Sequence, residues 1–223
     1  MDWQALKLSL WLGAWTAAAL IPCSIFISRV LAWHRFPGRN LLQAIMALPL
    51  ILPPTVLGFY LLTVFGTQSP LGEGYLALTG EPLVFSFQGL LLASLIFNIP
   101  FAVQPIQRAF ESIPQNLLEA AWCSGLGSWR TFCKIELPLA WPGILSAIIL
   151  TLAHTLGEFG VVLMVGGNIA GETRTIAISI YDRVQAFDNI NAGKMSALLL
   201  VISFSAITLI YTLNDRVNRH HVR

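Results

Sequence analysis

The sequence predicts an all-α, polytopic membrane protein with about five transmembrane helices. Of its 223 residues, 56% are hydrophobic and only 11% are charged, whereas soluble domains carry about 25% charged residues. The mean hydropathy is +0.71. The chain also contains several apolar runs of the roughly 20 residues that a helix needs to cross a bilayer. These run lengths favour a membrane domain over an unusually apolar soluble core.

Five expected spans follow from the positions of the apolar runs. Prolines inside the second and third runs should kink those helices, because proline removes a backbone hydrogen bond from the helical ladder. We expect the whole chain, residues 1–223, to form a single transmembrane domain. The spans are expected at about residues 8–33, 41–65, 84–106, 141–165 and 195–213.

The distribution of lysine and arginine predicts the orientation. With five spans the two termini lie on opposite sides, and nine of the 13 basic residues fall on the side of the C-terminus. Cytoplasmic segments carry the excess of basic residues. We therefore expect the N-terminus outside and the C-terminus in the cytoplasm. A long inner connection at about residues 107–139 then faces the cytoplasm, and a second long connection at 166–193 faces outward.

Several function classes are excluded by composition and by missing motifs. A net charge of +2 is too balanced to indicate nucleic-acid binding, and three cysteines without regular spacing give no disulfide framework. The sequence contains no Gly-x-x-x-x-Gly-Lys-Ser/Thr loop to cradle nucleotide phosphates. We expect neither an enzyme nor a cofactor or metal site, and any ATP must be hydrolysed by a separate chain.

The inner connection carries the signals of two short helices outside the bilayer. Ser112 and Gln115 form a capping-box pattern that predicts a helix start. This helix should end near Gly125 or Gly127, since glycine suits the left-handed position that follows a helix. A second short helix is expected over residues 129–135.

This connection resembles the EAA loop of bacterial ABC-importer permeases. In that family the short helix docks into a groove on the ATPase subunit and passes nucleotide-driven motion to the spans, so the resemblance implies two copies of an ABC ATPase as partners. The alternative is an amphipathic surface helix without a partner. The matching residues, which are the expected ATPase-docking residues, are Glu119, Ala120, Ala121, Gly125, Ile135, Leu137 and Pro138.

Three further segments resemble molybdate permeases within that family: residues 48–58, 156–160, and 168–176 with Tyr181. The first two are shared with sulfate permeases, and Ala170 departs from the proline common at its position. The resemblance implies a homodimeric importer of a tetrahedral oxyanion in a bacterial or archaeal cytoplasmic membrane. It also implies a periplasmic or extracellular oxyanion-binding protein and surrounding lipid. A sulfate or tungstate permease remains the alternative.

Polar residues inside the spans are candidates for a gate or a transport path. Such groups can line a path, but each can equally bond a helix backbone. Glu158 lies one helical turn after His154, so the two share a face. A proton-coupled secondary transporter using this pair is therefore an alternative, although Glu158 lies toward the outer end, where packing or gating roles are favoured. The candidate gate or path residues are Asn98, Thr151, Thr155 and Glu158.

Overall fold

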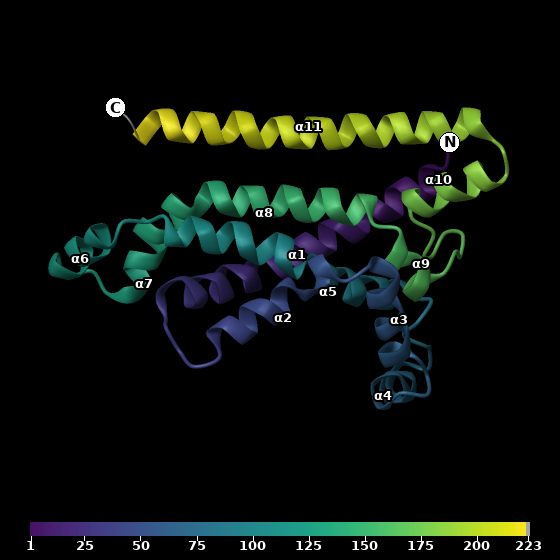
Figure 1. The fold of residues 1–223 in the computed structure, drawn as a ribbon, viewed down its shortest axis with the longest axis horizontal. Coiled ribbons are helices and arrows are strands. Elements are labelled where there is room, and N and C mark those ends of the chain that lie inside the picture. The colour runs from purple at the N-terminus through teal and green to yellow at the C-terminus, as the bar shows by residue number, and fades with distance from the viewer. Residues whose placement is uncertain (222–223) are drawn as a thin grey trace.

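The computed structural model describes residues 1–221, except for the side chains of Ile210 and residues 213–221. The described residues form eleven α-helices and one π-helical turn and contain no strand (Figure 1), which confirms the predicted all-α class. The elements are α1 (Trp3–Trp33), α2 (Arg39–Ile51), α3 (Pro54–Phe65), α4 (Pro70–Thr79), α5 (Phe87–Glu111), α6 (Gln115–Cys123), α7 (Ser128–Thr131), the π-helical turn η1 (Phe132–Glu136), α8 (Leu137–Gly157), α9 (Gly160–Gly166), α10 (Ile176–Gln185) and α11 (Asn189–His221).

Four helical stretches of the described chain are long and apolar enough to cross a membrane. They are α1, α5, the continuous stretch Ser128–Gly157 and the first part of α11, Asn189–Leu209. Each extends beyond its predicted span at one end or both: α1 begins about a turn before residue 8, and α5 ends about a turn after residue 106. The stretch Ser128–Gly157 begins before residue 141, and α11 begins at Asn189, before residue 195. If the pair α2 and α3 is counted as one span, it brings the total to five and corresponds to the second predicted span.

The second predicted span, residues 41–65, is divided rather than kinked. Helix α2 ends at Ile51, α3 begins at Pro54, and the two axes differ by 110°. Pro53 and Pro54 have no N–H to continue the ladder of α2, whereas proline is favoured in a first helical turn. The adjacent prolines therefore end one helix and start the next. By contrast, α5 continues through both Pro100 and Pro105.

The fourth predicted span, residues 141–165, is also divided. Helix α8 already begins at Leu137 and ends at Gly157, and the short helix α9 follows from Gly160. The N–H of Glu158 still bonds the carbonyl of His154 at 2.9 Å, but its backbone is extended, with a ψ of 129°. The chain therefore breaks between these two helices at Glu158.

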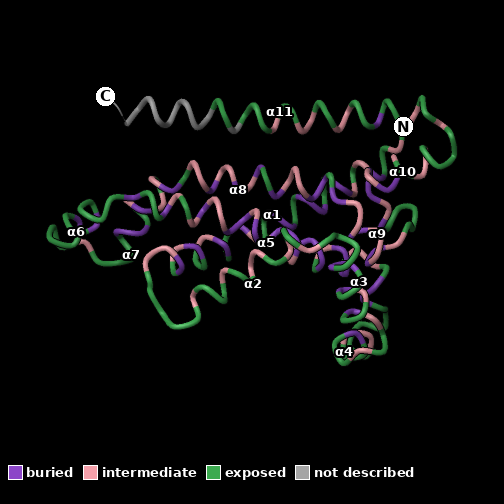
Figure 2. The backbone as a smooth tube through the Cα atoms, viewed as in Figure 1, coloured by how far each residue is buried: buried purple, intermediate pink, exposed green. Residues whose placement is uncertain are grey.

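Helices α1, α5 and α8 pack together as the centre of the fold, where Figure 2 shows most of the buried backbone. Their buried apolar side chains form two clusters. One cluster lies toward α3 and α9 and contains Leu12, Leu90 and Val162. The other lies toward α6 and contains Ile106, Phe110 and Ile144.

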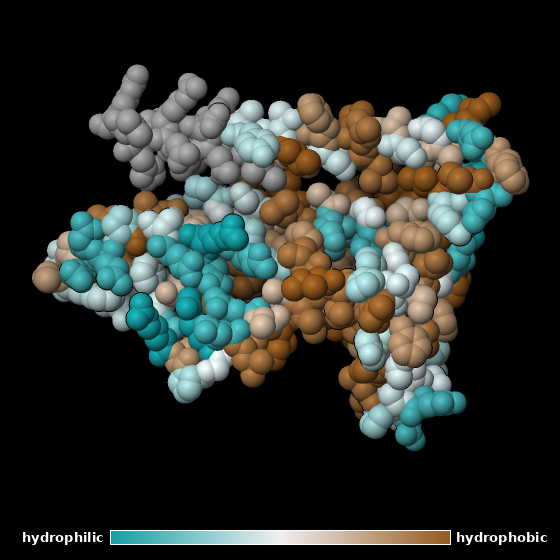
Figure 3. Space-filling view, in the orientation of Figure 1, coloured by the Kyte–Doolittle hydropathy of each residue, from teal (hydrophilic) through white to brown (hydrophobic). Residues whose placement is uncertain are grey.

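Helix α11 contacts little of the protein. It packs on α8 and α10, and only 11% of its most apolar window is buried (Figure 2). Exposed apolar residues such as Leu200 and Phe204 cover it. Hydrophobic side chains also dominate the middle of the molecular surface, while hydrophilic ones gather at the end that carries α6 and α7 (Figure 3). This pattern fits a domain embedded in lipid, with the α6 end in water.

The arrangement of ends agrees with the predicted five-span topology. Helix α1 starts at the end of the molecule opposite α6, and α11 runs back toward the α6 end (Figure 1). The predicted orientation depends in part on Arg216, Arg219 and Arg223, which are three of the nine basic residues on the side of the C-terminus. The side chains of these three residues lie outside the described part of the chain.

Candidate coupling loop and membrane polar layer

The loop between α5 and α8 contains a separate surface helix, α6, as predicted, but the proposed capping box is wrong. The Ser112 hydroxyl donates to the carbonyl of Ala109 at 2.8 Å, so Ser112 ends α5 instead of starting α6. Helix α6 begins at Gln115, directly after Pro114. The serine bonds backward because α5 extends to Glu111 and Ser112 already occupies its C-terminal cap.

Helix α6 ends where Gly125 adopts a left-handed conformation, with a φ of +79°. The N–H of Leu126 bonds the carbonyl of Ala121 at 3.1 Å, and the N–H of Gly125 bonds that of Trp122 at 2.9 Å. These two bonds define a Schellman motif, in which glycine is favoured because it has no Cβ. Of the two glycines predicted to end the helix, Gly125 is the one that does so.

One face of α6 is held by the protein and the other is free. Leu118 and Ala121 are buried, and Leu118 belongs to the cluster that contains Phe132. Glu119 and Ala120 are exposed, and Trp122 is 55% exposed beside them. The exposed face therefore combines a small side chain with a large aromatic one, so another protein surface can approach closely at Ala120.

The expected second short helix does not end before Leu137. Helix α7 passes through the π-helical turn η1 directly into α8. Ile135 lies in η1, while Leu137 and Pro138 occupy the first turn of α8. Pro138 has no N–H to donate, which weakens the α-helical ladder at this point without stopping the helix. The loop is thus rigidly continuous with the spanning helix α8.

A buried ion pair ties this junction to α1. The Arg29 guanidinium donates to both carboxylate oxygens of Glu136, with Nε–Oε2 at 2.5 Å and Nη2–Oε1 at 2.9 Å. Glu136 is 1% exposed. Arg29 also lies over the ring of Phe132, 5.2 Å from its centroid. Bidentate pairing fixes geometry as well as charge, so α1 and the start of α8 are held in one register.

Sequence reasoning missed this pair. From the sequence, Arg29 is one of the nine basic residues on the side of the C-terminus, and Glu136 has no predicted role. A signal exists for Arg29, which lies inside the first predicted span, because ionisable residues within a span usually have a functional or pairing role.

Between the two apolar clusters lies a layer of buried polar side chains. Asn98 donates to the Thr155 hydroxyl at 2.9 Å and to the carbonyl of Ser94 at the same distance. Thr16 donates to the Ser94 hydroxyl at 2.8 Å, and His154 Nδ1 lies 3.1 Å from Asn98 Oδ1. The layer therefore joins α1, α5 and α8 through side chains that satisfy one another, as buried polar groups require.

Glu158 stands at the edge of this layer, at the break after α8. Its Oε1 accepts from the N–H of Val161 at 2.9 Å, which caps the first turn of α9. Its Oε2 lies 3.9 Å from His154 Nε2. Thr151 is also buried, and its hydroxyl has no hydrogen-bond partner among the described residues. The structure thus joins Asn98 and Thr155 by a hydrogen bond and places Glu158 beside His154 of the same layer. Thr151 takes part only through its carbonyl, which accepts from the Thr155 hydroxyl at 2.8 Å.

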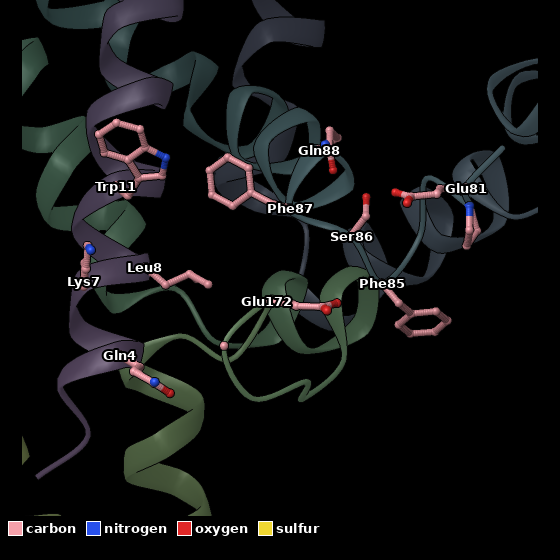
Figure 4. Close-up of a pocket in the computed structure, with 12 residues that line it drawn as sticks. Gln4, Lys7, Leu8, Trp11, Glu81, Phe85, Ser86, Phe87, Gln88 and Glu172 are labelled. Carbon is pink, nitrogen blue, oxygen red and sulfur yellow. The ribbon is translucent and has the colours of Figure 1, made fainter. Parts of the chain in front are cut away.

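The end opposite α6 carries a wide recess with a volume of about 1040 Å³. Figure 4 shows its walls: the first turns of α1 with Lys7 and Trp11, the segment before α5 with Glu81, and the loop with Glu172. Acidic, basic and aromatic side chains share one concave surface here. Such mixed surfaces suit a protein partner better than a small apolar ligand.

The divided spans and the exposed helical loop are features expected of the membrane component of an ABC importer. Residues 21–222 match the family described as "Binding-protein-dependent transport system inner membrane component". The chain belongs to this family. It is therefore a transport component and not a catalytic subunit.

The two ModB relatives match over nearly their whole length. The chain is 43% identical to the Molybdenum transport system permease protein ModB of Azotobacter vinelandii over 211 residues, which is 95% of this chain and 93% of that protein. It is 37% identical to ModB of Escherichia coli strain K12, over 94% of this chain and 90% of that protein. The Sulfate transport system permease protein CysT of the same strain is 34% identical, over 89% and 71% respectively.

Solved structures show the same fold. An ABC transporter involved in the import of the acidic polysaccharide alginate aligns with a TM-score of 0.71, covering 97% of this chain and 78% of that one at 18% identity. The MetNI methionine ABC transporter aligns with a TM-score of 0.68, covering 100% and 94%, also at 18% identity. These likenesses confirm the predicted importer-permease fold.

Proposed function

We propose that this chain is the transmembrane subunit through which molybdate enters the cell, driven by an ABC ATPase on a separate chain. The exposed face of α6, closed by the Schellman motif at Gly125, carries the ATP-driven part of this proposal. The assignment of molybdate as the substrate rests on the ModB relatives. They are more similar to this chain than the sulfate permease is, and they match over a larger share of their length. Tungstate or sulfate is the alternative cargo.

The partners follow from the two ends of the molecule. Two copies of the ATPase dock on the α6 helices of a homodimer, so the α6 end faces the cytoplasm and the N-terminus faces outward. The oxyanion-binding protein docks at the opposite end, where the recess lined by Lys7, Glu81 and Glu172 is open. Lipid covers the apolar surface outside the dimer contact.

The route by which ATPase motion reaches the spans is short. Leu118 packs α6 into the cluster that contains Phe132, which lies in η1. Glu136 then binds Arg29, and η1 runs directly into α8. A displacement of α6 therefore moves the start of α8 and the end of α1 together.

The candidate gate residues have a positioning role in this proposal. Glu158 caps α9, and the layer around Asn98 and Thr155 holds the C-terminal part of α8 against α5. The cap and the hydrogen bond fix the point at which the outer part of the divided span begins. In this proposal the polar layer therefore positions the gate, and the anion does not pass through the layer. The proton-transport alternative loses its support, because the chain belongs to the ABC-importer family and His154 is stacked on Phe101 at 3.9 Å.

Reconstitution tests the proposal. The chain and its ATPase partner, placed in proteoliposomes with the binding protein, should accumulate labelled molybdate only when ATP is supplied on the α6 side. Excess tungstate should compete more strongly than excess sulfate. Uptake that persists without the ATPase and follows a pH gradient would refute the ATP-driven function, and equal competition by sulfate would refute the molybdate assignment.

A further inference from the structure

The two divided spans meet each other on the side away from α6. A Cβ placed on Gly58 of α3 would lie 2.8 Å from the Cβ of Met164 on α9, and a Cβ on Gly160 would lie 2.7 Å from that of Pro54. Distances this short mean that α3 and α9 pack with almost no space between their backbones. The outer parts of both divided spans therefore pack directly against each other within the chain.

On the α6 side the corresponding helices, α2 and α8, flank a recess whose floor is α5. One cavity of about 310 Å³ lies between α2 and α5, and a second of about 140 Å³ lies between Leu50 of α2 and Leu150 of α8. Both cavities are lined by Pro100, Gln104 and Arg108. These three positions are spaced by four, so they form one stripe along α5.

The stripe carries its one positive charge at its last position, Arg108. No carboxylate of the described residues lies within 4.0 Å of the Arg108 guanidinium. Glu111, which also lines the larger cavity, is already bound by Arg39 at 3.3 Å and by Gln107 at 2.8 Å. The recess therefore presents a guanidinium whose hydrogen-bond donors are not matched to an acid.

We propose that Arg108, with the amides of Gln104 and Gln43, forms an anion site in the inner half of the transport path, where the oxyanion is held as it leaves. A guanidinium offers several N–H donors in a fixed fork that matches a tetrahedral oxyanion, and the glutamine amides add neutral donors. Gln43 lines the larger cavity from α2. The site rests on the proposed oxyanion import and adds the group that receives the cargo on the α6 side of the contact between α3 and α9.

The competing explanation is that Arg108 is one more basic residue of a cytoplasmic end, present for orientation only. Arg35 provides the matched control, because it is also an exposed arginine at the α6 end but lines neither cavity. An orientation role predicts that both arginines behave alike. A site predicts that only Arg108 affects transport.

The test measures oxyanion uptake per ATP hydrolysed in proteoliposomes, using whichever of molybdate, tungstate or sulfate the wild-type protein transports best. We expect Arg108→Ala to lower this ratio at least tenfold, Arg108→Lys to lower it less, and Arg35→Ala to leave it within twofold of wild type. Equal ratios for Arg108→Ala and Arg35→Ala would overturn the anion site while leaving the importer function intact. Transport of none of the three oxyanions by the wild-type protein would refute the proposed function itself.

Discussion

The ion pair between Arg29 and Glu136 allows a quantitative prediction, because its two members differ in how costly each is to lose. Arg29→Ala leaves the Glu136 carboxylate buried without its partner. Removing one member of a buried pair costs about 3–5 kcal/mol, and since the Arg29 side chain is 29% exposed, we expect about 3 kcal/mol. Glu136→Gln keeps an acceptor for the guanidinium and should cost about 1–2 kcal/mol.

Replacing both members should cost less than replacing arginine alone. In Arg29→Met with Glu136→Leu no charge remains to be desolvated, so the stability should return to within about 1 kcal/mol of wild type. The assay is reversible denaturant unfolding of the purified protein in detergent, followed by tryptophan fluorescence. A double variant less stable than Arg29→Ala, or an Arg29→Ala variant as stable as wild type, would refute the energetic reasoning.

Three further predictions concern local packing. Gly143→Ala places a Cβ 2.4 Å from that of Ala109, so it should destabilise the α5–α8 contact by about 1–3 kcal/mol. The control is Gly193→Ala, whose Cβ meets nothing within 4 Å. This control should be neutral or slightly stabilising in the same unfolding assay. Gly125→Val should weaken co-purification of the ATPase, since a β-branched residue at a φ of +79° distorts the end of α6. The control is Gly127→Val, because Gly127 has a φ of −71°. Equal retention of the ATPase by both variants would contradict the docking role. Asn98→Ala should cost about 1 kcal/mol by breaking the hydrogen bonds that its side chain makes to Ser94, His154 and Thr155, and no change in unfolding would show that the layer is not a structural tie.

Local signals predicted most of what lies within one helix or turn. The end of α6 at Gly125 follows from the conformational freedom of glycine, and the approach of His154 to Glu158 follows from their spacing of four. The division of the second span followed only in part. Two adjacent prolines indicated a kink, but the bend of 110° also depends on the packing of α3 against α9.

Contacts between distant segments could not be predicted in the same way. Arg29 and Glu136 are 107 residues apart, and nothing in their neighbouring sequence names the partner. Asn98 and Thr155 were each candidates for a path because they are polar residues inside spans. Their mutual hydrogen bond depends on how α5 and α8 face each other, which requires the complete bundle.

The π-helical turn η1 has a consequence for how this region can vary. An α-helix advances about 100° per residue, and a π-helical turn contains about one residue more than an α-helical turn. Because the extra residue is contained within one turn, deleting a single residue between Phe132 and Glu136 would restore α-helical winding and leave the helices on either side nearly in their present rotation. A deletion within the regular part of α8 would instead rotate everything before it, including the exposed face of α6, by about 100° about the axis of α8. A single-residue deletion should therefore be better tolerated in η1 than within α8.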